Sequence, residues 1–540
     1  MRVIIVEPAP VDHRWFHTYI RTPHLGPPIL ARLLREAGHQ AHVFSEFVRP
    51  LNLQELSGSD LIGISINTGL THQRAYEIAR EVRRLYPNVQ LVAGGHHATI
   101  NCDEALRHVD YVVRGYAETS FPRLVEEIRM GNWRPTTPGV SFRDPDTNEV
   151  VNNPSAPSTP INTRPALEAI AGYPEVISEH RWHLHRFGTF LPLSFFSRGC
   201  GFRCNFCTIP LADDPRMSYR TPDEVIEDLR YQLDFYRFSY GRPRVWLIDD
   251  NFGQERTRTL EFLRVLAEVD LGCDFVVQAR VEISRDPELL TMMRRARLRA
   301  VYIGVESVSD DSLKSMHKYS NCVKIERTVR AVHRAGIDVV ALLMFGNDGD
   351  RPGVGSVTLN FLRGLGVKFI CPQITVPYPG TPFHRQVVGE GRLFSSDYRF
   401  CNRRPVHFPK TMRPSQVVRE IVETTLRHHS AVRAVADALR LRVHNLITRR
   451  GILDGGFIER TLAAIPELEE LERDYYDSDD RLREDRVCRD AERGVLLERA
   501  ATLTLNGRAA KSDADTFFEW QALDARRRPS TAARDHGRMD

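Results

Sequence analysis

The chain has 540 residues, of which 42% are hydrophobic and 27% are charged, and its formal net charge at pH 7 is +4. This length suggests about three domains, and the dispersed basic residues give no indication of a nucleic-acid partner. No apolar run approaches the roughly 18 residues that a membrane span needs, and residues 1–6 are too few for a signal-peptide core. We therefore expect a cytoplasmic protein with no integral membrane segment.

Residues 1–130 alternate short apolar runs with amphipathic segments. The predicted strands are 3–6, 61–66, 89–93 and 111–113, and the predicted helices are 28–37, 71–86 and 121–128. This alternation predicts an open, Rossmann-like α/β sheet over residues 1–134. In such sheets ligands bind at the carboxyl ends of the strands, where small residues let a large cofactor approach the backbone. Two loops of this kind, 63–69 and 93–99, contain Ser65 and the pair Gly94 and Gly95.

A second α/β region is predicted after a connector over residues 135–190, which is rich in Pro, Asn, Ser and Thr. Six strands are predicted at 191–197, 245–248, 275–279, 300–305, 339–345 and 369–376. Six such units predict a partial (β/α)6 TIM barrel over 191–393, whose chemistry lies at the carboxyl ends of its strands. Residues 394–524 are predicted to form a mainly helical domain, with helices in 414–442, 458–503 and near 517–520. Residues 525–540 are predicted to be a disordered tail.

Three cysteines, Cys200, Cys204 and Cys207, follow the first of these barrel strands. The chain has nine cysteines, and chance would produce this spacing about 0.0025 times. Three thiolates on one loop can each bind one iron of a 4Fe-4S cube and leave the fourth iron open to a substrate or cofactor.

Two other interpretations of the triplet remain. A structural zinc site would need a fourth ligand, which His180, His183 or His185 could supply, but zinc ligands more often come as two separated pairs. The cysteines could also be ordinary core residues.

The stretch 197–208, with its C-x3-C-x2-C spacing, resembles the cluster loop of the radical S-adenosylmethionine (SAM) superfamily. The resemblance implies that SAM chelates the open iron and that one electron from the cluster cleaves it to a 5'-deoxyadenosyl radical. An external one-electron reductant of the flavodoxin or ferredoxin type is then a partner. Phe206, between the last two cysteines, is included among the expected cofactor-binding residues.

Further polar residues follow the other predicted strands of the barrel: Asp249 and Asp250 the second, Gln278 and Arg280 the third, and Glu306 the fourth. A cationic amino group, a sulfonium and ribose hydroxyls call for carboxylates and other acceptors, and Arg280 suits the methionyl carboxylate. We therefore predict that these residues bind SAM. Taken singly, the Asp-Asp pair is also typical of a helix cap, and Glu306 of a surface ion pair.

The two N-terminal loops, together with residues 112–119, resemble the cobalamin-binding domain that precedes the radical domain in one branch of this superfamily. The resemblance implies that Ser65, Gly94 and Gly95 contact the nucleotide tail of cobalamin. Two features depart from that family: residues 114–118 read Arg-Gly-Tyr-Ala-Glu, and no D-x-H-x-x-G follows the first strand. These departures argue against a lower axial histidine.

His13, His96 and His97 are accordingly interpreted as loop residues. A plain Rossmann-like domain with another ligand, or none, is the alternative for residues 1–134.

Together the two resemblances imply a cobalamin-dependent radical SAM enzyme that uses a 4Fe-4S cluster, SAM and cobalamin. The most common reaction of this kind is methyl transfer to an unactivated carbon of a small-molecule or lipid substrate. Ring closure or rearrangement is an alternative within the class, and a non-catalytic cobalamin or redox sensor is an alternative outside it. No catalytic side chain is assigned from the sequence.

Overall fold

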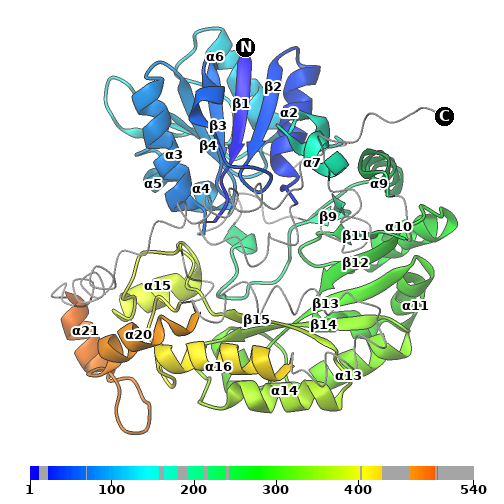
Figure 1. Cartoon of the computed structure of the whole chain (residues 1–540), viewed down its shortest axis with the longest axis vertical. Coiled ribbons are helices and arrows are strands. Elements are labelled where there is room, and N and C mark those ends of the chain that lie inside the picture. The colour runs from blue at the N-terminus through cyan, green and yellow to red at the C-terminus, as the bar shows by residue number, and fades with distance from the viewer. Residues whose placement is uncertain are drawn as a thin grey trace, which may run out of the picture.

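The computed structural model describes residues 1–10, 22–67, 70–156, 163–179, 192–211, 217–238, 242–399, 401, 404–428, 461–492 and 496. In Figure 1 an N-terminal α/β domain lies against a larger α/β domain, and a helical region lies beside the larger one. No helix within these ranges is long and apolar enough to cross a membrane.

The N-terminal domain is built on a mainly parallel sheet. Over the described residues it has seven strands in the order β2-β1-β3-β4-β5-β6-β7. They are β1 (Arg2–Glu7), β2 (Gln40–Ser45), β3 (Leu61–Ser65), β4 (Gln90–Gly94), β5 (Tyr111–Val113), β6 (Val140–Arg143) and β7 (Val150–Asn152). β1 to β5 pair in parallel, which confirms the Rossmann-like prediction and adds β2 to the predicted strands.

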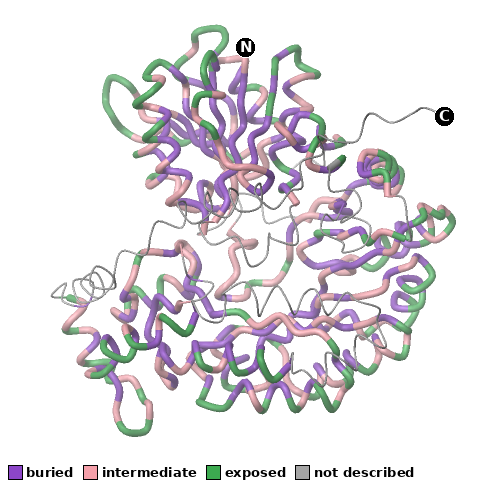
Figure 2. The backbone as a smooth tube through the Cα atoms, in the orientation of Figure 1, coloured by how far each residue is buried: buried purple, intermediate pink, exposed green. Residues whose placement is uncertain are grey.

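Helices cover both faces of this sheet because successive side chains of a strand point to opposite faces. Val3 and Ile5 of β1 lie in a buried cluster with α2 and α6, whereas Ile4 and Val6 lie in one with α3. The helices are α2 (Gly26–Glu36), α3 (His72–Leu85), α4 (His96–Ile100), α5 (Cys102–Ala105) and α6 (Ala117–Arg129). Figure 2 shows the strands as the most continuously buried part of the domain.

The predicted connector, residues 135–190, begins inside the first domain. β6 and β7 form an antiparallel hairpin that extends the sheet beyond β5. Val140 and Phe142 are buried there, and Phe142 lies opposite Tyr111. The predicted boundary after residue 134 is therefore too early, because these short strands were hidden among turn-forming residues. The short helix α7 (Tyr173–Glu179) follows.

The second sheet is parallel, as predicted for the partial barrel. In the part of the chain that is described, its six strands lie in the order β15-β14-β13-β12-β11-β8. They are β8 (Leu193–Ser194), β11 (Arg244–Leu247), β12 (Asp274–Ala279), β13 (Leu298–Glu306), β14 (Asp338–Phe345) and β15 (Phe369–Ile374). A two-stranded antiparallel pair, β9 (Ser197–Arg198) and β10 (Ser218–Tyr219), lies beside it. The helices of this domain are α9 (Pro222–Tyr236), α10 (Arg256–Glu268), α11 (Pro287–Arg295), α12 (Asp310–Ser315), α13 (Cys322–Arg334) and α14 (Val354–Gly364).

The C-terminal region is helical where it is described. Its helices are α15 (Pro382–Gly389), α16 (Pro414–His428), α20 (Ile465–Glu472) and α21 (Glu484–Glu492). Phe394, Phe408 and Leu468 lie in a buried cluster of this region, which supports the predicted helical domain. The predicted helix at 458–503 is interrupted, because residues 473–483 form turns and an isolated bridge between α20 and α21. Residues 429–442, 458–460, 493–495 and 497–503 lie outside the described residues, as do 517–520 and the tail 525–540.

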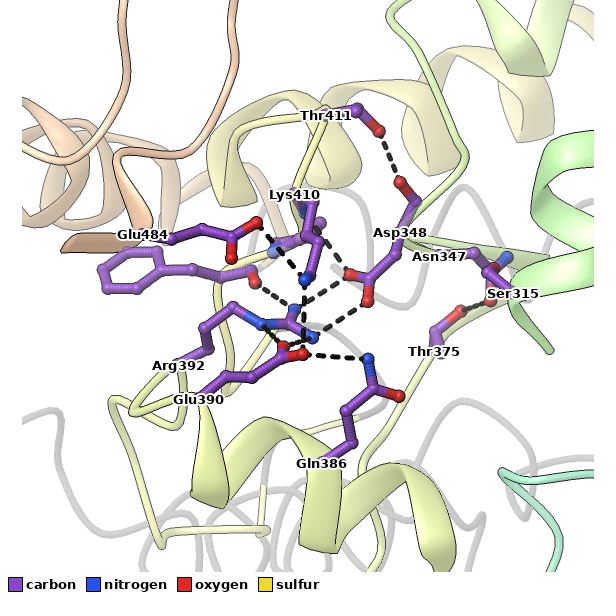
Figure 3. A network of polar contacts seen from close by, with 12 residues as sticks. Ser315, Asn347, Asp348, Thr375, Gln386, Glu390, Arg392, Lys410, Thr411 and Glu484 are labelled. Carbon is purple, nitrogen blue, oxygen red and sulfur yellow. Dashed lines mark hydrogen bonds and ion pairs between the residues drawn. The ribbon is translucent and has the colours of Figure 1, made fainter. Parts of the chain in front are cut away.

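A network of charged groups joins this region to the barrel (Figure 3). Arg392 is fully buried and binds both carboxyl oxygens of Asp348, in the loop after β14, at 2.8 Å each. It also binds Glu390 at 2.6 Å and donates to the carbonyl of Phe408 at 2.7 Å. Lys410 lies 3.2 Å from Glu390. Bidentate contacts of this kind fix both distance and orientation, so the network sets the position of the helical region.

We predict that Arg392→Ala lowers the free energy of unfolding by about 3–5 kcal/mol, because it leaves the buried carboxyl group of Asp348 without its cation. Arg330→Ala is the matched control, since the pair of Arg330 with Glu326 is exposed on α13. Its expected cost is about 0.3–0.5 kcal/mol. Chemical denaturation of both variants measures the difference, and equal losses would contradict the structural role of Arg392.

Candidate active site

The three cysteines lie on the loop between β9 and a short 3-10 helix (Ile209–Leu211), at the carboxyl end of the second sheet. Cys200, Cys204 and Cys207 are all free thiols and partly exposed. Gly199 precedes them with φ of 91°, a conformation that favours glycine. The loop therefore presents three thiols at the end of the barrel where its chemistry is expected.

Asp249, two residues after the end of β11, holds the start of this loop. Its carboxyl group accepts hydrogen bonds from the backbone N–H of Phe196 at 2.9 Å and of Ser197 at 2.7 Å, and from the Ser197 hydroxyl at 2.5 Å. Burial raises the pKa of Asp249 to about 6, and these hydrogen bonds oppose that rise. Asp249, which was predicted to bind SAM, is therefore hydrogen-bonded within the chain and anchors the cysteine loop.

Asp250 holds the next part of the loop and faces the first domain. It accepts a hydrogen bond from the backbone N–H of Gly199 at 2.8 Å. Burial raises its pKa, while nearby His96 and Arg198 act in the opposite direction. Because His96 belongs to α4 of the first domain, Asp250 lies where the two domains meet.

Arg280 lies against the cysteine loop from the end of β12. Its guanidinium lies 3.8 Å from the centre of the Phe202 ring, and Nη1 lies 3.3 Å from Sγ of Cys204. Nη2 is buried and has no hydrogen-bond partner among the described residues. A donor left unpaired beside the thiols suits a carboxylate of the bound cofactor, as predicted for Arg280.

Burial raises the pKa of Cys207 to about 12 and also raises that of Cys200, whereas Arg280 lowers the latter. The neutral thiol is thus favoured at Cys200 and Cys207, and bound iron would supply the positive charge that thiolates need. The donor set and the unpaired guanidinium therefore fit a cluster with a SAM-type ligand.

Glu306 ends β13 with φ of 62°, next to a shift in the register of β13 against β14. Its Oε1 lies 2.5 Å from Nζ of Lys318, a buried lysine that the sequence analysis missed. A buried cation is the partner that a buried carboxylate requires. The ion pair is thus internal to the domain, not on the surface as the alternative interpretation held.

The last two residues predicted to bind the cofactors of the barrel, Gln278 and Phe206, lie in different environments. Gln278 is partly exposed on β12, and its carbonyl accepts a hydrogen bond from the backbone of Phe252. Phe206 is partly buried and packs against the hydrophobic core of the barrel. Phe206 thus fixes the loop from the side of the core.

A cavity of about 240 Å³ lies at the carboxyl ends of the first sheet. Ser65, Gly94 and Gly95 all line it, as do Thr99 and Phe121. Ser65 and Gly94 are paired neighbours on β3 and β4, which explains how two separate loops reach one cavity. The structure therefore brings together the three residues predicted to contact cobalamin.

Gly95 must be a glycine for two reasons. Its φ is 98°, and a Cβ atom there would lie 2.6 Å from the carbonyl oxygen of Ile66. Gly94 has more room, since a Cβ atom would lie 3.6 Å from the carbonyl oxygen of Val113. Gly95 is thus required by the chain's own packing, while both glycines line the cavity.

The histidines interpreted as loop residues have different positions. His96 lines the cavity at the start of α4. His97 is buried in α4, where its ring stacks on that of His72 at 4.5 Å and lies near Glu104. Both are therefore helical, since α4 begins directly after the glycine pair. His13 and the candidate zinc ligands at 180–185 lie outside the described residues.

Arg198 and Glu118 connect the cavity to the cysteine loop. Arg198 comes directly before that loop and forms an ion pair with Glu118, at the start of α6 in the first domain. Both line the cavity, and Arg198 also lies over the rings of Tyr116 and Phe195. Both residues lie within stretches singled out from the sequence, 197–208 and 114–118, but the sequence gave no sign that they pair.

Comparison with known families bears out the two-domain interpretation. The model of the B12 binding domain matches residues 18–125, and that of the Radical SAM superfamily matches residues 194–352. The chain therefore combines a B12-binding domain with a radical SAM domain. This confirms the enzyme class and the prediction of cobalamin, SAM and a 4Fe-4S cluster as cofactors.

Several curated relatives of this enzyme carry methyltransferase names. An uncharacterized methyltransferase of Pyrococcus horikoshii is 23% identical over 78% of this chain and 94% of its own length. The hopanoid C-2 methylase of Rhodopseudomonas palustris is 31% identical, over 38% of this chain and 40% of the relative. The bacteriochlorophyllide d C-12(1)-methyltransferase of Chlorobaculum tepidum is 25% identical over 64% of this chain and 69% of its own.

Two solved structures share the fold of the enzyme. The radical SAM methyltransferase TsrM from Kitasatospora setae superposes with a TM-score of 0.63 at 16% identity, over 87% of this chain and 100% of its own. The cobalamin-dependent SAM radical enzyme OxsB also gives 0.63, at 14% identity over 96% of this chain and 83% of its own. At these identities the likeness shows the shared architecture.

We predict that anaerobically reconstituted enzyme holds about four irons per chain at this loop. Replacing Cys200, Cys204 and Cys207 together by Ala should remove that iron and abolish SAM cleavage. Cys322→Ala, which changes a cysteine at the start of α13, should leave both unchanged. Iron analysis and detection of 5'-deoxyadenosine are the measurements; iron and cleavage retained in the triple variant would contradict the assignment.

A second prediction concerns the cavity. Gly94→Trp should weaken cobalamin binding at least tenfold, because the indole fills the space beside Ser65. Gly364→Trp is the control, since Gly364 lies in α14 with open space around it. Equilibrium binding measured by absorbance tests both. Equal affinity in the Gly94 variant and the wild type would show that cobalamin does not bind in this cavity.

Proposed function

We propose that the enzyme transfers a methyl group to an unactivated carbon of a small-molecule or lipid substrate. One observation carries the proposal: the cysteine loop and the cavity are joined by the Arg198–Glu118 ion pair, so the two predicted cofactor sites face each other. The methyltransferase names of the relatives support the same reaction.

The bound cofactors supply a radical that removes a hydrogen atom and the methyl group that replaces it. The residues of the chain orient these groups. Arg280 would pair with the carboxylate of SAM through Nη2, which has no hydrogen-bond partner among the described residues. Glu306 would accept a hydrogen bond from SAM, while its ion pair with Lys318 balances its charge. Asp249 and Asp250 keep the cysteine loop in place, and Gly94 and Gly95 admit the nucleotide tail. An external one-electron reductant is part of the proposal.

Ring closure is the second candidate, and a specific observation favours it. The anaerobic magnesium-protoporphyrin IX monomethyl ester cyclase of Rubrivivax gelatinosus is 23% identical over 68% of this chain and 65% of its own length. This identity equals that of the Pyrococcus methyltransferase, so identity alone does not separate the reactions. A non-catalytic sensor is disfavoured because it has no need of the cysteine loop and Arg280.

The experiment that separates these reactions uses SAM with a labelled methyl group, a reductant and cellular extracts of a deletion strain as the source of substrate. A methyltransferase incorporates label into product and consumes two SAM, one giving 5'-deoxyadenosine and one S-adenosylhomocysteine. A cyclase forms 5'-deoxyadenosine with no label in product. A sensor forms neither 5'-deoxyadenosine nor labelled product over multiple turnovers. Product without label would contradict the methyltransferase proposal.

We further predict that Glu306→Gln slows turnover at least tenfold at low SAM concentration, because a lost charge-assisted hydrogen bond costs about 1.5–3 kcal/mol. The control is Glu326→Gln, which changes a carboxylate of an exposed pair on α13. Initial rates at several SAM concentrations provide the test. Wild-type kinetics in the Glu306 variant would remove this residue from the SAM site.

A further inference from the structure

Two histidines and a glutamate come together in the first domain, outside the lining of the cavity. His72 begins α3, His97 lies in α4 and Glu104 lies in α5. Each side chain offers one possible ligand atom, and these three atoms lie within 4.8 Å of one another. The histidines are buried, with 7% and 4% of their surface exposed, and Glu104 is partly buried. Three separate helices therefore supply the nitrogen and oxygen donors that a metal ion uses.

A ring nitrogen of His97 is buried without a hydrogen bond. Its Nε2 atom has no hydrogen-bond partner among the described residues, and Oε1 of Glu104 lies 3.5 Å away. N–H···O hydrogen bonds prefer about 2.7–3.2 Å. Two ligand atoms of a tetrahedral zinc ion, each about 2.0–2.1 Å from the metal, lie about 3.3–3.4 Å apart. The separation thus suits two ligands of one ion better than it suits a hydrogen bond, and an ion explains the unpaired nitrogen.

The two histidine rings need a small rearrangement to share an ion. They stack with their centres 4.5 Å apart and 17° between their planes. A ring nitrogen binds a metal in the plane of its own ring, so one ring must turn away from the other. The turn is about χ2, which has a broad energy minimum in histidine. Two imidazoles and one carboxylate, with a water in the fourth position, are an established donor set for zinc.

The short helix α4 lies between this group and the cavity, at the end of the first domain that faces the rest of the chain (Figure 1). His96 and Thr99 of α4 line the cavity, whereas the neighbouring His97 contacts His72 and Glu104. A helix of five residues has little stability of its own. Its position therefore depends on what holds it from outside.

The group also touches the C-terminal region. The ring of Tyr398, which is 3% exposed, lies edge-on to the ring of His72 at 6.1 Å and 64°. Tyr398 belongs to a small buried cluster with Val376 and Cys401, against which Leu70 of the first domain packs. The group thus lies where the first domain meets the segment that follows the barrel.

We propose that His72, His97 and Glu104 bind one zinc ion, which ties α4 to α3 and α5 behind the cobalamin cavity. The ion has a positioning role: by fixing His97 it also fixes His96 and Thr99, which form part of the cavity wall on the same helix. The site is chemically distinct from the cysteine loop, because its donors are nitrogen and oxygen without sulfur.

The test uses full-length protein whose cluster has been reconstituted, so that iron occupies the cysteine loop, with zinc chloride as the probe. After removal of free metal, we expect about one zinc per chain. X-ray absorption at the zinc edge should show nitrogen and oxygen neighbours at about 2.0–2.1 Å and no sulfur at about 2.3 Å. No retained zinc, or zinc with sulfur neighbours, would overturn the proposal. This measurement needs no cobalamin, so its outcome is independent of the cofactor assignment.

Glu104→Gln keeps the size of the side chain but removes its charge, and it should weaken zinc binding at least tenfold in competition with a chromophoric chelator. Glu77→Gln is the matched control, because Glu77 on α3 is a carboxylate of the same 38% exposure. His97→Ala should also lose the zinc, and His42→Ala, which changes an exposed histidine on β2, should keep it. Equal zinc affinity in Glu104→Gln and Glu77→Gln would remove Glu104 from the site and overturn the proposal.

The positioning role has its own measurement. Zinc should strengthen cobalamin binding at least twofold in the wild type and in Glu77→Gln, and it should have no effect in Glu104→Gln. Absorbance titrations with and without zinc measure this difference. A cobalamin affinity that does not respond to zinc in the wild type would overturn the positioning role of the ion.

Discussion

Two adjacent carboxyl groups at the end of β11 determine the shape of the cysteine loop. Asp249 accepts hydrogen bonds from three donors of residues 196 and 197, and burial raises its pKa to about 6. Asp250 binds the N–H of Gly199 and faces His96 of the first domain. A buried carboxyl group is tolerated only where it is well hydrogen-bonded, so this pair ties the loop to one conformation. The cysteines depend on that conformation to present their thiols together.

The same end of the barrel meets the carboxyl edge of the N-terminal sheet. Arg198 leads into the cysteine loop, yet it pairs with Glu118 and lines the cavity of the other domain. Parallel sheets place their ligand sites at the carboxyl ends of strands, so two such sheets with these ends facing each other bring two ligands close together. Toward the opposite edge of the second sheet from β8, the Arg392–Asp348 contact holds the helical region against the loop after β14.

The sequence predicted the sheets because buried parallel strands read as apolar runs, and β5 has the predicted bounds. It also predicted which loops line the cavity, since Ser65 and the glycine pair follow such strands. It did not predict partners that come from distant segments. Lys318 beside Glu306 and Glu7 beside His24 are set by tertiary packing and leave no periodic pattern. The hairpin β6–β7 was missed because its short strands lie among turn-forming residues, which read as a connector.

The central claim is that the cluster and the cobalt lie close to each other across the two domains. Electron paramagnetic resonance of protein loaded with both cofactors, with the cluster reduced and the cobalt as Co(II), tests it directly. If the claim is correct, the two unpaired spins interact, and each signal is split or broadened relative to protein that holds only one cofactor. A spectrum equal to the simple sum of the two separate signals would contradict the arrangement.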